Sequence, residues 1–491
     1  MTNSWADLAG RLGADLILDV ESAPGSRGRR TALATALRAA ITDGRLVPGS
    51  TLPPYRSLAA DLQMARGTVS GVYQELIAEG WLVARVGSAT RVADLTHVAT
   101  TPHARPDPPA APAYDFRLGQ PQPALFPRAD WIRSTRRALE AAPHSAFGVG
   151  DPQGHLATRK ALAAYLGRVR GVRTDEHHIV LTTSVSQSLE LLSRTVFDDT
   201  VAVESYGLPF HREVIERGGT RVTPIAIDTG GLDVARLAES SATAVVVTPS
   251  HQYPTGHALD PRRRAHLVDW ARTRGGVIIE DDYDGELRYD RDPVGAIQGL
   301  APDDVIHLGS AGKSLSPAVR IGWIVVPDRL IADVVRAKGL REATASIVDQ
   351  MVFADMIESG AYDRHVRRSR SHYRARRDAI TATMNARGVE VSGMSAGLHA
   401  VLTVSPTIEA RALELATERR FVVAGLDGFR HPDAAPLPSG GIVVGFATPP
   451  EHRFQADIAA LADLLVTAAD SDSITSTVVA KSMHLSVTDC P

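Results

Sequence analysis

Residues 305–326 read VIHLGSAGKSLSPAVRIGWIVV and contain two short apolar runs on either side of a polar loop. Nearly continuous runs such as VIHLG (305–309) and GWIVV (322–326) are typical of strands covered on both faces in a mainly parallel sheet. The loop between the runs holds Lys313, four residues beyond the end of the first run. The stretch therefore predicts a buried strand with a lysine just past its carboxyl end.

Five further apolar runs extend this pattern toward the N-terminus: HIVL (178–181), VAVE (201–204), TPIAI (223–227), AVVVT (244–248) and GVIIE (276–280). Amphipathic segments between the runs, such as Ser186–Val196 and Arg262–Arg274, predict crossover helices. We therefore expect an α/β body with a mainly parallel sheet, followed from about Ile331 by a smaller α+β part. Ligands bind beyond the carboxyl ends of the strands in such sheets, so functional side chains should directly follow the runs.

The composition of the 491-residue chain is that of a globular protein. Hydrophobic residues make up 44% and charged residues 22%, which excludes disorder of the whole chain and suggests two or three domains. No apolar run approaches the roughly 20 residues of a membrane-spanning helix, and residues 1–19 lack the pattern of a signal peptide. We expect a cytoplasmic protein without a membrane partner. The single cysteine, Cys490, excludes a disulfide framework and a multi-cysteine metal site, and no metal is predicted.

Charge and proline content divide the chain into segments. Residues 25–94 contain nine Arg and five acidic residues, a net charge of +4, so the overall charge of −3 leaves −7 for the remainder. A stretch rich in proline and alanine follows and favours an extended, semi-rigid linker. The Ser/Thr-rich end of the chain is predicted to have little fixed structure. The predicted segments are a basic module (1–95), a linker (96–113), a large domain (114–330), a smaller domain (331–469) and a tail (470–491).

The basic module has the element order of a winged helix-turn-helix. Residues 32–41 and 57–62 are predicted helices, and a turn at 63–66 leads to a further helix. That helix has apolar residues at i, i+3, i+4, i+7 and i+8, an amphipathic stripe, formed by Val69, Val72, Tyr73, Leu76 and Ile77. Residues 81–92 predict a two-stranded hairpin. Helix, short helix, turn, helix and hairpin together predict a module that binds double-stranded DNA.

The N-terminal residues of the second helix of a helix-turn-helix enter the major groove. In this chain they include Arg66 and Thr68, while Arg56 and Arg91 are placed to contact phosphates or bases from flanking positions. Gly87, near the tip of the hairpin, completes the predicted DNA-contacting set. The alternative is a solvated helical module whose arginines are ordinary surface charges, because arginine is abundant throughout the chain.

A family resemblance favours DNA binding. The stretch LPPYRSLAADLQMARGTVSGVYQELIAEGWL (52–82) resembles the GntR-type DNA-binding domain over its whole length. It shares the family pattern of Leu-Pro, then Arg, then Leu-Ala, then Arg-x-Thr-Val, and a Leu-x-x-x-Gly ending. The resemblance implies a winged helix that binds operator DNA.

The loop lysine has neighbours that suit pyridoxal phosphate (PLP). This cofactor needs a lysine amine that forms an aldimine with its aldehyde, and a carboxylate that holds the proton on its ring nitrogen. The chain has four lysines, and of these Lys313 directly follows a predicted buried strand. Asp281 and Tyr283 follow the GVIIE run and provide a carboxylate and a hydroxyl at another strand end.

Two segments suit the phosphate group of that cofactor, which binds N–H groups at a helix start, hydroxyls and an arginine. Ser186 and Gln187 open a predicted helix, and Ser310 and Arg320 flank the lysine loop. Each piece has a plainer interpretation: a surface lysine, a solvated or cation-binding acidic turn at 280–284, and a serine helix cap. Their occurrence together at strand ends favours a PLP site.

The body resembles the MocR family, which joins a GntR-type winged helix to an aminotransferase fold type I domain through a linker. The resemblance covers about residues 32–465 and is carried by VTPSHQYPTG (247–256), VIIEDDYDGEL (277–287), LGSAGKSLSPAVRIGW (308–323), HVRRSRSHYRARRD (365–378) and SAGLH (395–399). It implies that Lys313 holds PLP, that Asp281 binds the ring nitrogen and that Tyr283 lies near the ring oxygen. It also implies a phosphate cup of Ser310, Arg320, Ser186 and Gln187, and a head-to-tail homodimer.

The chain departs from the family pattern at several positions. Val443 stands where an arginine would bind an effector carboxylate, and Leu208 stands where an aromatic residue would stack on the cofactor ring. Tyr206 or His211 would then cover the ring instead. Val149 replaces a tyrosine before Gly-Asp-Pro, and Val185 replaces a glycine of the phosphate turn. Because transamination requires a substrate aligned over the lysine, these changes favour sensing over turnover, and we assign no catalytic residue.

The sequence therefore predicts a dimeric, PLP-binding transcriptional regulator. Its effector is an amine sensed at the PLP aldimine, or PLP itself is the effector, as in the family's regulators of vitamin B6 metabolism. One alternative is an active PLP-dependent aminotransferase that carries a DNA-binding domain. Another is a regulator whose body has lost the cofactor and serves as a dimerisation scaffold.

Overall fold

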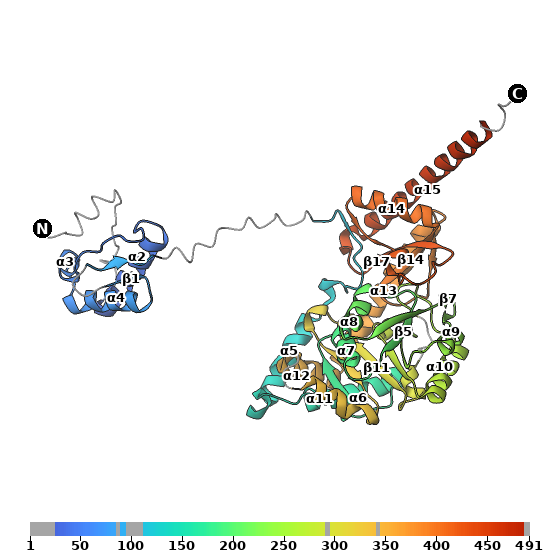
Figure 1. Ribbon diagram of the computed structural model, residues 1–491, viewed down its shortest axis with the longest axis horizontal. Helices are drawn as coiled ribbons and strands as arrows, with labels where there is room; N and C mark the ends of the chain where they lie inside the picture. Colours follow the sequence, from blue (N-terminus) through green and yellow to red (C-terminus); the bar gives the residue numbers. More distant parts are fainter. Residues whose placement is uncertain (1–24, 85–88, 95–110, 290–294, 340–343, 486–491) are drawn as a thin grey trace. The chain divides into compact units, whose positions relative to one another are not determined.

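The computed structural model describes residues 25–84, 89–94, 111–289, 295–339 and 344–485, and within these ranges the side chains of residues 28–470. The chain divides into two compact units, Met1–Ala110 and Ala111–Pro491 (Figure 1). Each unit has a hydrophobic core of its own.

The first unit is a winged helix-turn-helix, as the sequence predicts. Its elements are α2 (Gly25–Thr42), α3 (Tyr55–Asp61), α4 (Arg66–Ala78) and an antiparallel hairpin of β1 (Leu82–Val83) and β2 (Arg91–Val92). Four residues of the predicted stripe on α4 are buried in the core with Leu33, Leu37 and Leu58: Val69, Val72, Tyr73 and Leu76. Gly87, predicted at the tip of the hairpin, lies outside the described residues.

A seven-stranded sheet forms the centre of the second unit, with the order β4-β12-β11-β10-β9-β5-β6. Its strands are β4 (Ile179–Thr182), β5 (Thr200–Glu204), β6 (Arg221–Ile225), β9 (Ala244–Val247), β10 (Val277–Asp281), β11 (Val305–Ser310) and β12 (Gly322–Val325). β12 runs antiparallel to both of its neighbours, and the other pairs are parallel. Each predicted apolar run contributes to one of these strands, so the α/β prediction is confirmed.

Helices cover both faces of this sheet. Val180 of β4 enters a core with α7 (Val185–Ser193), α8 (Pro209–Arg217) and α11 (Asp328–Lys338). The adjacent residues Ile179 and Leu181 enter a different core with α6 (Leu156–Arg170) and α12 (Ile347–Glu358). Toward the middle of the sheet, α9 (Val234–Glu239) and α10 (Pro261–Arg274) form a further core with β9 and β10. Apolar side chains on both sides of each strand explain why the runs are continuous rather than alternating.

The C-terminal part contains a four-stranded antiparallel sheet with the order β13-β14-β17-β16. Its strands are β13 (Glu390–Ser392), β14 (His399–Val404), β16 (Ala424–Gly425) and β17 (Gly440–Gly445), and α13 (Ala361–Asn385) and α14 (Pro406–Glu418) pack against it. The start of the unit joins this part, because β3 (Tyr114–Asp115) pairs with β15 (Phe421–Val422). Phe353 of α12, which follows the predicted boundary at residue 330, packs on Trp323 of the large sheet.

The last described helix is α15 (Phe454–Leu485), which extends into the predicted tail. Residues 470–485 continue this helix, although the sequence predicts a tail with little fixed structure from residue 470. The first turns of α15 are anchored in the core by Ile458, Leu461 and Leu465, and adding residues to an existing helix costs less than starting one. Residues 486–491 lie outside the described residues. Among the described helices, none is long and apolar enough to cross a membrane.

Candidate functional site

A cavity of about 550 Å³ lies at the carboxyl ends of the strands of the large sheet. This volume is within the range of about 300–1,000 Å³ that is typical of small-molecule sites. Residues that follow β4, β5, β10 and β11 line the cavity, and Leu398, His399 and Phe429 of the C-terminal part complete its wall. Of the predicted cofactor residues, the cavity wall includes Lys313, Asp281, Tyr283, Ser310, Arg320 and Ser186, but not Gln187.

Lys313 lies in the turn after β11, and its Nζ donates a hydrogen bond of 2.6 Å to the carbonyl oxygen of Gly119. Burial lowers the pKa of this amine, and the negative charges of Asp284 and Asp281 oppose the shift. A lowered pKa increases the neutral fraction of an amine, which is the form that attacks an aldehyde. A Cβ at Gly119, whose φ is +73°, would lie 2.7 Å from Lys313 Nζ, so a side chain there would displace the lysine.

Asp281 is the last residue of β10, and its side chain is buried in the cavity wall. Its Oδ1 atom has no hydrogen-bond partner among the described residues. Burial, with the nearby charges of Asp282 and Asp284, raises the pKa of Asp281 to about 8. A buried carboxylate oxygen without a partner is costly, and an N–H donor or a cation in the cavity would relieve that cost.

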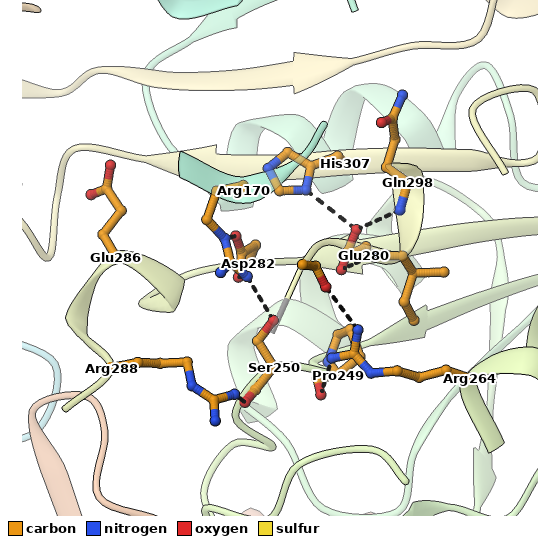
Figure 2. A network of polar contacts seen from close by, with 12 residues as sticks. Arg170, Pro249, Ser250, Arg264, Glu280, Asp282, Glu286, Arg288, Gln298 and His307 are labelled. Carbon is orange, nitrogen blue, oxygen red and sulfur yellow. Dashed lines mark hydrogen bonds and ion pairs between the residues drawn. The ribbon is translucent and has the colours of Figure 1, made fainter. Parts of the chain in front are cut away.

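The residues on either side of Asp281 are turned to the opposite face of the strand, because side chains alternate along β structure. Arg170 binds both carboxylate oxygens of Asp282, at 2.7 and 2.9 Å, and Gln298 N donates a hydrogen bond of 3.1 Å to the carboxylate of Glu280 (Figure 2). Ile297 N donates a further hydrogen bond of 2.8 Å to Glu280. Breaking a buried ion pair of this kind is strongly destabilising. The two paired carboxylates therefore hold the strand in the register that leaves Asp281 facing the cavity.

A hydrogen-bonded group of side chains lies beside Tyr283. The Tyr283 hydroxyl is 3.0 Å from Nδ1 of His251, and the same Nδ1 is 2.7 Å from Oδ2 of Asp284. Burial raises the pKa of Tyr283 well above its usual value, so the phenol keeps its proton. The potential metal-ligating atoms of His251, Asp284 and His399 lie within 4.8 Å of one another. The sequence predicts no metal, and the contacts of His251 Nδ1 are those of a hydrogen-bond network that orients Tyr283.

The first turn of α7 forms one edge of the cavity. Ser184 caps this helix, and its side chain accepts a hydrogen bond of 3.2 Å from Gln187 N. Ser186 lines the cavity, whereas Oε1 of Gln187 accepts hydrogen bonds from N and Oγ1 of Thr183. The helix start, with its N–H groups and positive dipole end, suits a phosphate, but the structure does not bring the Gln187 side chain to it.

Ser310 and Arg320 approach the cavity from the two ends of the lysine loop. Ser310 ends β11, and Arg320 precedes β12 with a left-handed φ of +55°. This conformation is uncommon for residues other than glycine and costs roughly 1–3 kcal/mol. The exposed guanidinium of Arg320 has no hydrogen-bond or ion-pair partner within the described part of the chain. An arginine held in this way beside the cavity is available to an anion.

Three of the departures from the family pattern are valines. Val443 lies in β17, is fully buried and is not part of the cavity wall. Val149 is 83% exposed and also lies away from the wall. Val185 is the first residue of α7 and contributes an apolar side chain to the wall. None of these positions supplies a polar group to a ligand.

The position expected to stack on a cofactor ring is filled by Leu208, which lines the cavity. Tyr206 also lines it, but its hydroxyl accepts a hydrogen bond of 2.9 Å from Leu437 N, and the side chain is buried. His211 lines the same wall, and burial lowers its pKa to about 4. Of the two candidates, His211 is the one whose side chain has no described hydrogen bond that would hold it in place.

The groups in the cavity wall fit PLP. The unpartnered Oδ1 of Asp281 suits a protonated ring nitrogen, and the amine of Lys313 suits an aldehyde. The start of α7 and the guanidinium of Arg320 suit a phosphate. Donors, acceptors and charges are therefore of the kinds that this cofactor requires.

In the first unit, the arginines predicted to contact DNA form no ion pair within the described residues, unlike Arg30 and Arg38 of the same unit. Arg66 is the first residue of α4 and is exposed, and Arg56 is exposed on α3 with its guanidinium 5.8 Å from the ring of Tyr55. Thr68 lies half-buried in the first turn of α4. Arg91 is exposed and donates a hydrogen bond of 3.0 Å to Gly49 O.

Other arginines of this unit are engaged within the fold. Arg38 forms ion pairs with Glu75 and Glu79 at 2.8 and 2.6 Å, and Arg30 is 3.0 Å from Glu75. Arg29 donates a hydrogen bond of 2.8 Å to Leu62 O at the end of α3. These contacts join α2 to α3 and α4, so the net positive charge of the module overstates the number of cations that are free for DNA.

Sequence reasoning missed Gly119, His251 and His399 as parts of the site. Gly119 lies 194 positions before Lys313, and its positive φ follows from tertiary contacts. The two histidines stand in the VTPSHQYPTG and SAGLH segments that carry the family resemblance. The position of each histidine in such a segment was therefore a signal that the sequence offered. The residues that each histidine contacts could not be derived from spacing along the chain.

Two family models match the chain. The model described as "Aminotransferase class I and II" matches residues 115–435, and the model of bacterial regulatory proteins of the gntR family matches residues 29–92. Together they account for both units. The aminotransferase class I fold is that of PLP-dependent proteins, so the match implies this cofactor, and the gntR match implies DNA binding.

Comparison with individual proteins agrees with this division. The pyridoxine biosynthesis regulator PdxR of Corynebacterium glutamicum is 31% identical over 440 residues, 88% of this chain and 95% of that protein. The probable rhizopine catabolism regulatory protein MocR of Rhizobium meliloti is 29% identical over 440 residues, 84% and 88% of the two chains. A kynurenine aminotransferase of Pyrococcus horikoshii, solved with PMP, superposes with a TM-score of 0.66 at 25% identity and covers 73% of this chain and 92% of its own.

Proposed function

The chain belongs to the MocR family, in which a GntR-type DNA-binding domain is joined to an aminotransferase-like domain, and on this premise we propose that it is a transcriptional regulator that responds to PLP. The winged helix binds operator DNA, and the ligand in the cavity of the second unit changes that binding. Linkage requires that the ligand and DNA affect each other's affinity equally. The observation that carries the proposal is the unpartnered, buried carboxylate of Asp281 in the same cavity as Lys313.

Each part of the cofactor has a candidate partner in the chain. Lys313 Nζ would hold the aldehyde, and Asp281 would accept a hydrogen bond from the ring nitrogen. Tyr283, oriented by His251, would donate to the ring oxygen. The start of α7, with Ser186, would bind the phosphate together with Ser310 and Arg320. When bound, PLP supplies an electrophilic aldehyde conjugated to an electron-withdrawing ring.

The effector is proposed to be PLP itself. The similarity to PdxR, a pyridoxine biosynthesis regulator, supports a role in vitamin B6 metabolism. The fully buried Val443 supports it too, because it removes the arginine that would anchor the carboxylate of an amino-acid effector.

The proposal is tested on cofactor-free full-length protein with a DNA fragment selected from a random pool by the wild-type protein. Addition of PLP is expected to produce a visible absorption band and to change the affinity for the fragment. Lys313→Ala should lose the band and the response, whereas Lys160→Ala, which removes an exposed lysine, should keep both. Unchanged DNA affinity in the PLP-loaded wild-type protein would refute PLP as the effector.

A homodimer is also proposed. Among the described residues, five exposed large apolar side chains fall within one stretch of 25 residues that runs from α5 (Arg128–Ala141) through η3 (His144–Phe147) and the following loop to the start of α6: Ile132, Leu139, Phe147, Val149 and Leu156. Exposed apolar residues concentrated in this way mark interaction surfaces, and a second copy of the chain is the proposed partner. Two winged helices in one dimer would bind two half-sites at a fixed spacing.

A further inference from the structure

The cationic side chains of the cavity wall are few, and most are already engaged. Among the described residues, the lysine and arginine side chains in the wall are Lys313, Arg212 and Arg320. Arg212 donates hydrogen bonds of 3.0–3.3 Å to the carbonyl oxygens of Gly207, Phe429 and Arg430. Lys313 is the amine that the proposed function uses. Arg320 alone remains for an anion, and the phosphate of the cofactor would take it.

The histidines of the wall do not add positive charge near neutral pH. Burial lowers the pKa of His211 to about 4, and burial with the neighbouring His251 lowers the pKa of His399 well below its usual value. Both rings are therefore neutral and can act only as hydrogen-bonding or stacking groups.

Acidic side chains, in contrast, are present close to Lys313. Glu204, Asp281 and Asp284 all lie in the wall. Oε2 of Glu204 accepts a hydrogen bond of 2.6 Å from Thr248 Oγ1, and Oδ2 of Asp284 is 2.7 Å from His251. The negative charges of Asp284 and Asp281 favour the protonated form of Lys313. Burial raises the pKa of Glu204 to about 7 and that of Asp281 to about 8, so neither is fully charged near neutral pH. The negative charge of Asp284 is therefore the main one near Lys313, and it attracts an incoming ammonium group and repels a carboxylate.

The remainder of the wall is mainly apolar and includes Leu189, Val203, Leu208, Phe210, Ile215 and Phe429. A carboxylate placed against these side chains loses its water without gaining a charged partner, which is unfavourable. A hydrocarbon group in the same place gains from burial.

We propose that the cofactor-loaded cavity selects primary amines that carry no carboxylate and excludes α-amino acids. This inference depends on the proposed binding of PLP at Lys313. The exchange is balanced without an oxidant: the ammonium group first loses a proton to water, the neutral amine nitrogen then forms a C=N double bond to the carbon that was the aldehyde carbon, the C=N double bond from that carbon to Lys313 Nζ breaks, and the two protons of the amine nitrogen end on Nζ, which is released as a neutral amine. Such amines would act together with the cofactor as a second signal at the same site.

The test uses the full chain loaded with PLP and two matched pairs, phenethylamine with L-phenylalanine and isobutylamine with L-valine. Within each pair the side chain is the same and only the carboxylate differs. The change in the visible absorption band is followed during titration, with free PLP as the baseline. Each amine is expected to reach half-saturation at a concentration at least tenfold lower than its amino acid, and equal or tighter binding of the amino acids overturns the inference.

Two variants sharpen the result. Val443 lies behind the wall, where it packs in one apolar cluster with the wall residues Tyr206 and Phe429. Val443→Arg would place a guanidinium there and should shift the preference toward the amino acids, whereas Val443→Met, without charge, should not. A loss of amino-acid binding in Arg212→Met while amine binding is kept would show that Arg212 anchors a carboxylate, and would overturn the inference. If wild-type protein gives no band with PLP, the proposed function itself fails. A normal band with no preference for amines contradicts only the selectivity.

Discussion

At the scale of single residues, the chemistry of the cavity depends on which side of a strand each side chain faces. Glu280, Asp281 and Asp282 are consecutive acidic residues, yet the first is bound by backbone N–H groups and the third by an arginine. The second faces the cavity, and its Oδ1 has no hydrogen-bond partner in the described part of the chain. A shift of one residue in β10 would exchange these environments. The different pKa values of Asp281 and Asp282, one raised and one lowered, follow from that arrangement.

Asp281 should make the stability of the cofactor-free protein decrease with pH. Folding raises its pKa to about 8, so the folded state binds this proton more tightly than the unfolded state. The resulting stabilisation is complete below the ordinary aspartate pKa of about 4 and is lost as pH rises through the folded value. Asp281→Asn stays neutral and should show a smaller fall in Tm between about pH 5 and 8. The exposed Asp433→Asn is the control, and equal falls in all three proteins would contradict the assignment.

Gly119 should be required for the position of Lys313. Gly119→Ala would place a Cβ 2.7 Å from Lys313 Nζ and should weaken PLP binding at least tenfold, measured by absorption titration. Gly388→Ala is a matched control, because Gly388 has the same φ of +73° and a Cβ there would meet no atom within 4 Å. Both variants carry the same backbone strain, so equal PLP affinities would argue against a role for Gly119.

At the scale of elements, the start of α4 differs from the rest of the basic module in the contacts that its arginine makes. Arg66 is exposed at the first position of the helix, whereas Arg30 on α2 is paired with Glu75 of the same helix α4. Ion pairs on the surface contribute little stability, but they direct an arginine away from other partners. The exposed start of α4 therefore stays the predicted DNA-contacting end of the winged helix, while other arginines hold its helices together.

Arg66→Ala should weaken binding to the selected DNA fragment by about 1–3 kcal/mol and, if Arg66 contacts a phosphate, reduce the slope of log K against log salt by about 0.9. Arg30→Ala should change affinity far less. Fluorescence anisotropy at several salt concentrations measures both quantities. Similar losses in the two variants would mean that the net charge of the module, rather than the start of α4, determines binding.

At the scale of the whole molecule, the proposed dimer predicts a specific effect of the exposed apolar residues. Phe147 is 54% and Val149 83% exposed, and replacing both with Asp should give a monomer in sedimentation experiments, because each buried charge in the interface would be unpaired. Leu300→Asp changes a residue that is 59% exposed outside this stretch and should leave the dimer intact. A wild-type chain that sediments as a monomer would refute the proposal.

The sequence by itself determined the two kinds of domain and the fold class. Apolar runs reveal strands buried on both faces because burial acts on every residue of such a strand, and the stripe on α4 reveals one buried helix face because the helix repeats every 3.6 residues. The sequence reveals such patterns because they depend only on residues that are close together along the chain. The same patterns predicted Lys313 and Asp281 as residues at strand ends, and their role in binding PLP stays a prediction.

Only the tertiary structure decided which side chains share the cavity, and which of these side chains already have hydrogen-bond or ion-pair partners. Gly119 meets Lys313 across 194 positions, His251 and Asp284 meet beside Tyr283, and Gln187 turns back to its own helix start. It also decided which of the described cationic side chains in the cavity wall can bind an anion. Arg212 is hydrogen-bonded to carbonyl oxygens and Lys313 is the proposed reactive amine, which leaves Arg320. Contacts between distant segments depend on how sheets and helices pack, and no periodicity along the chain records that packing.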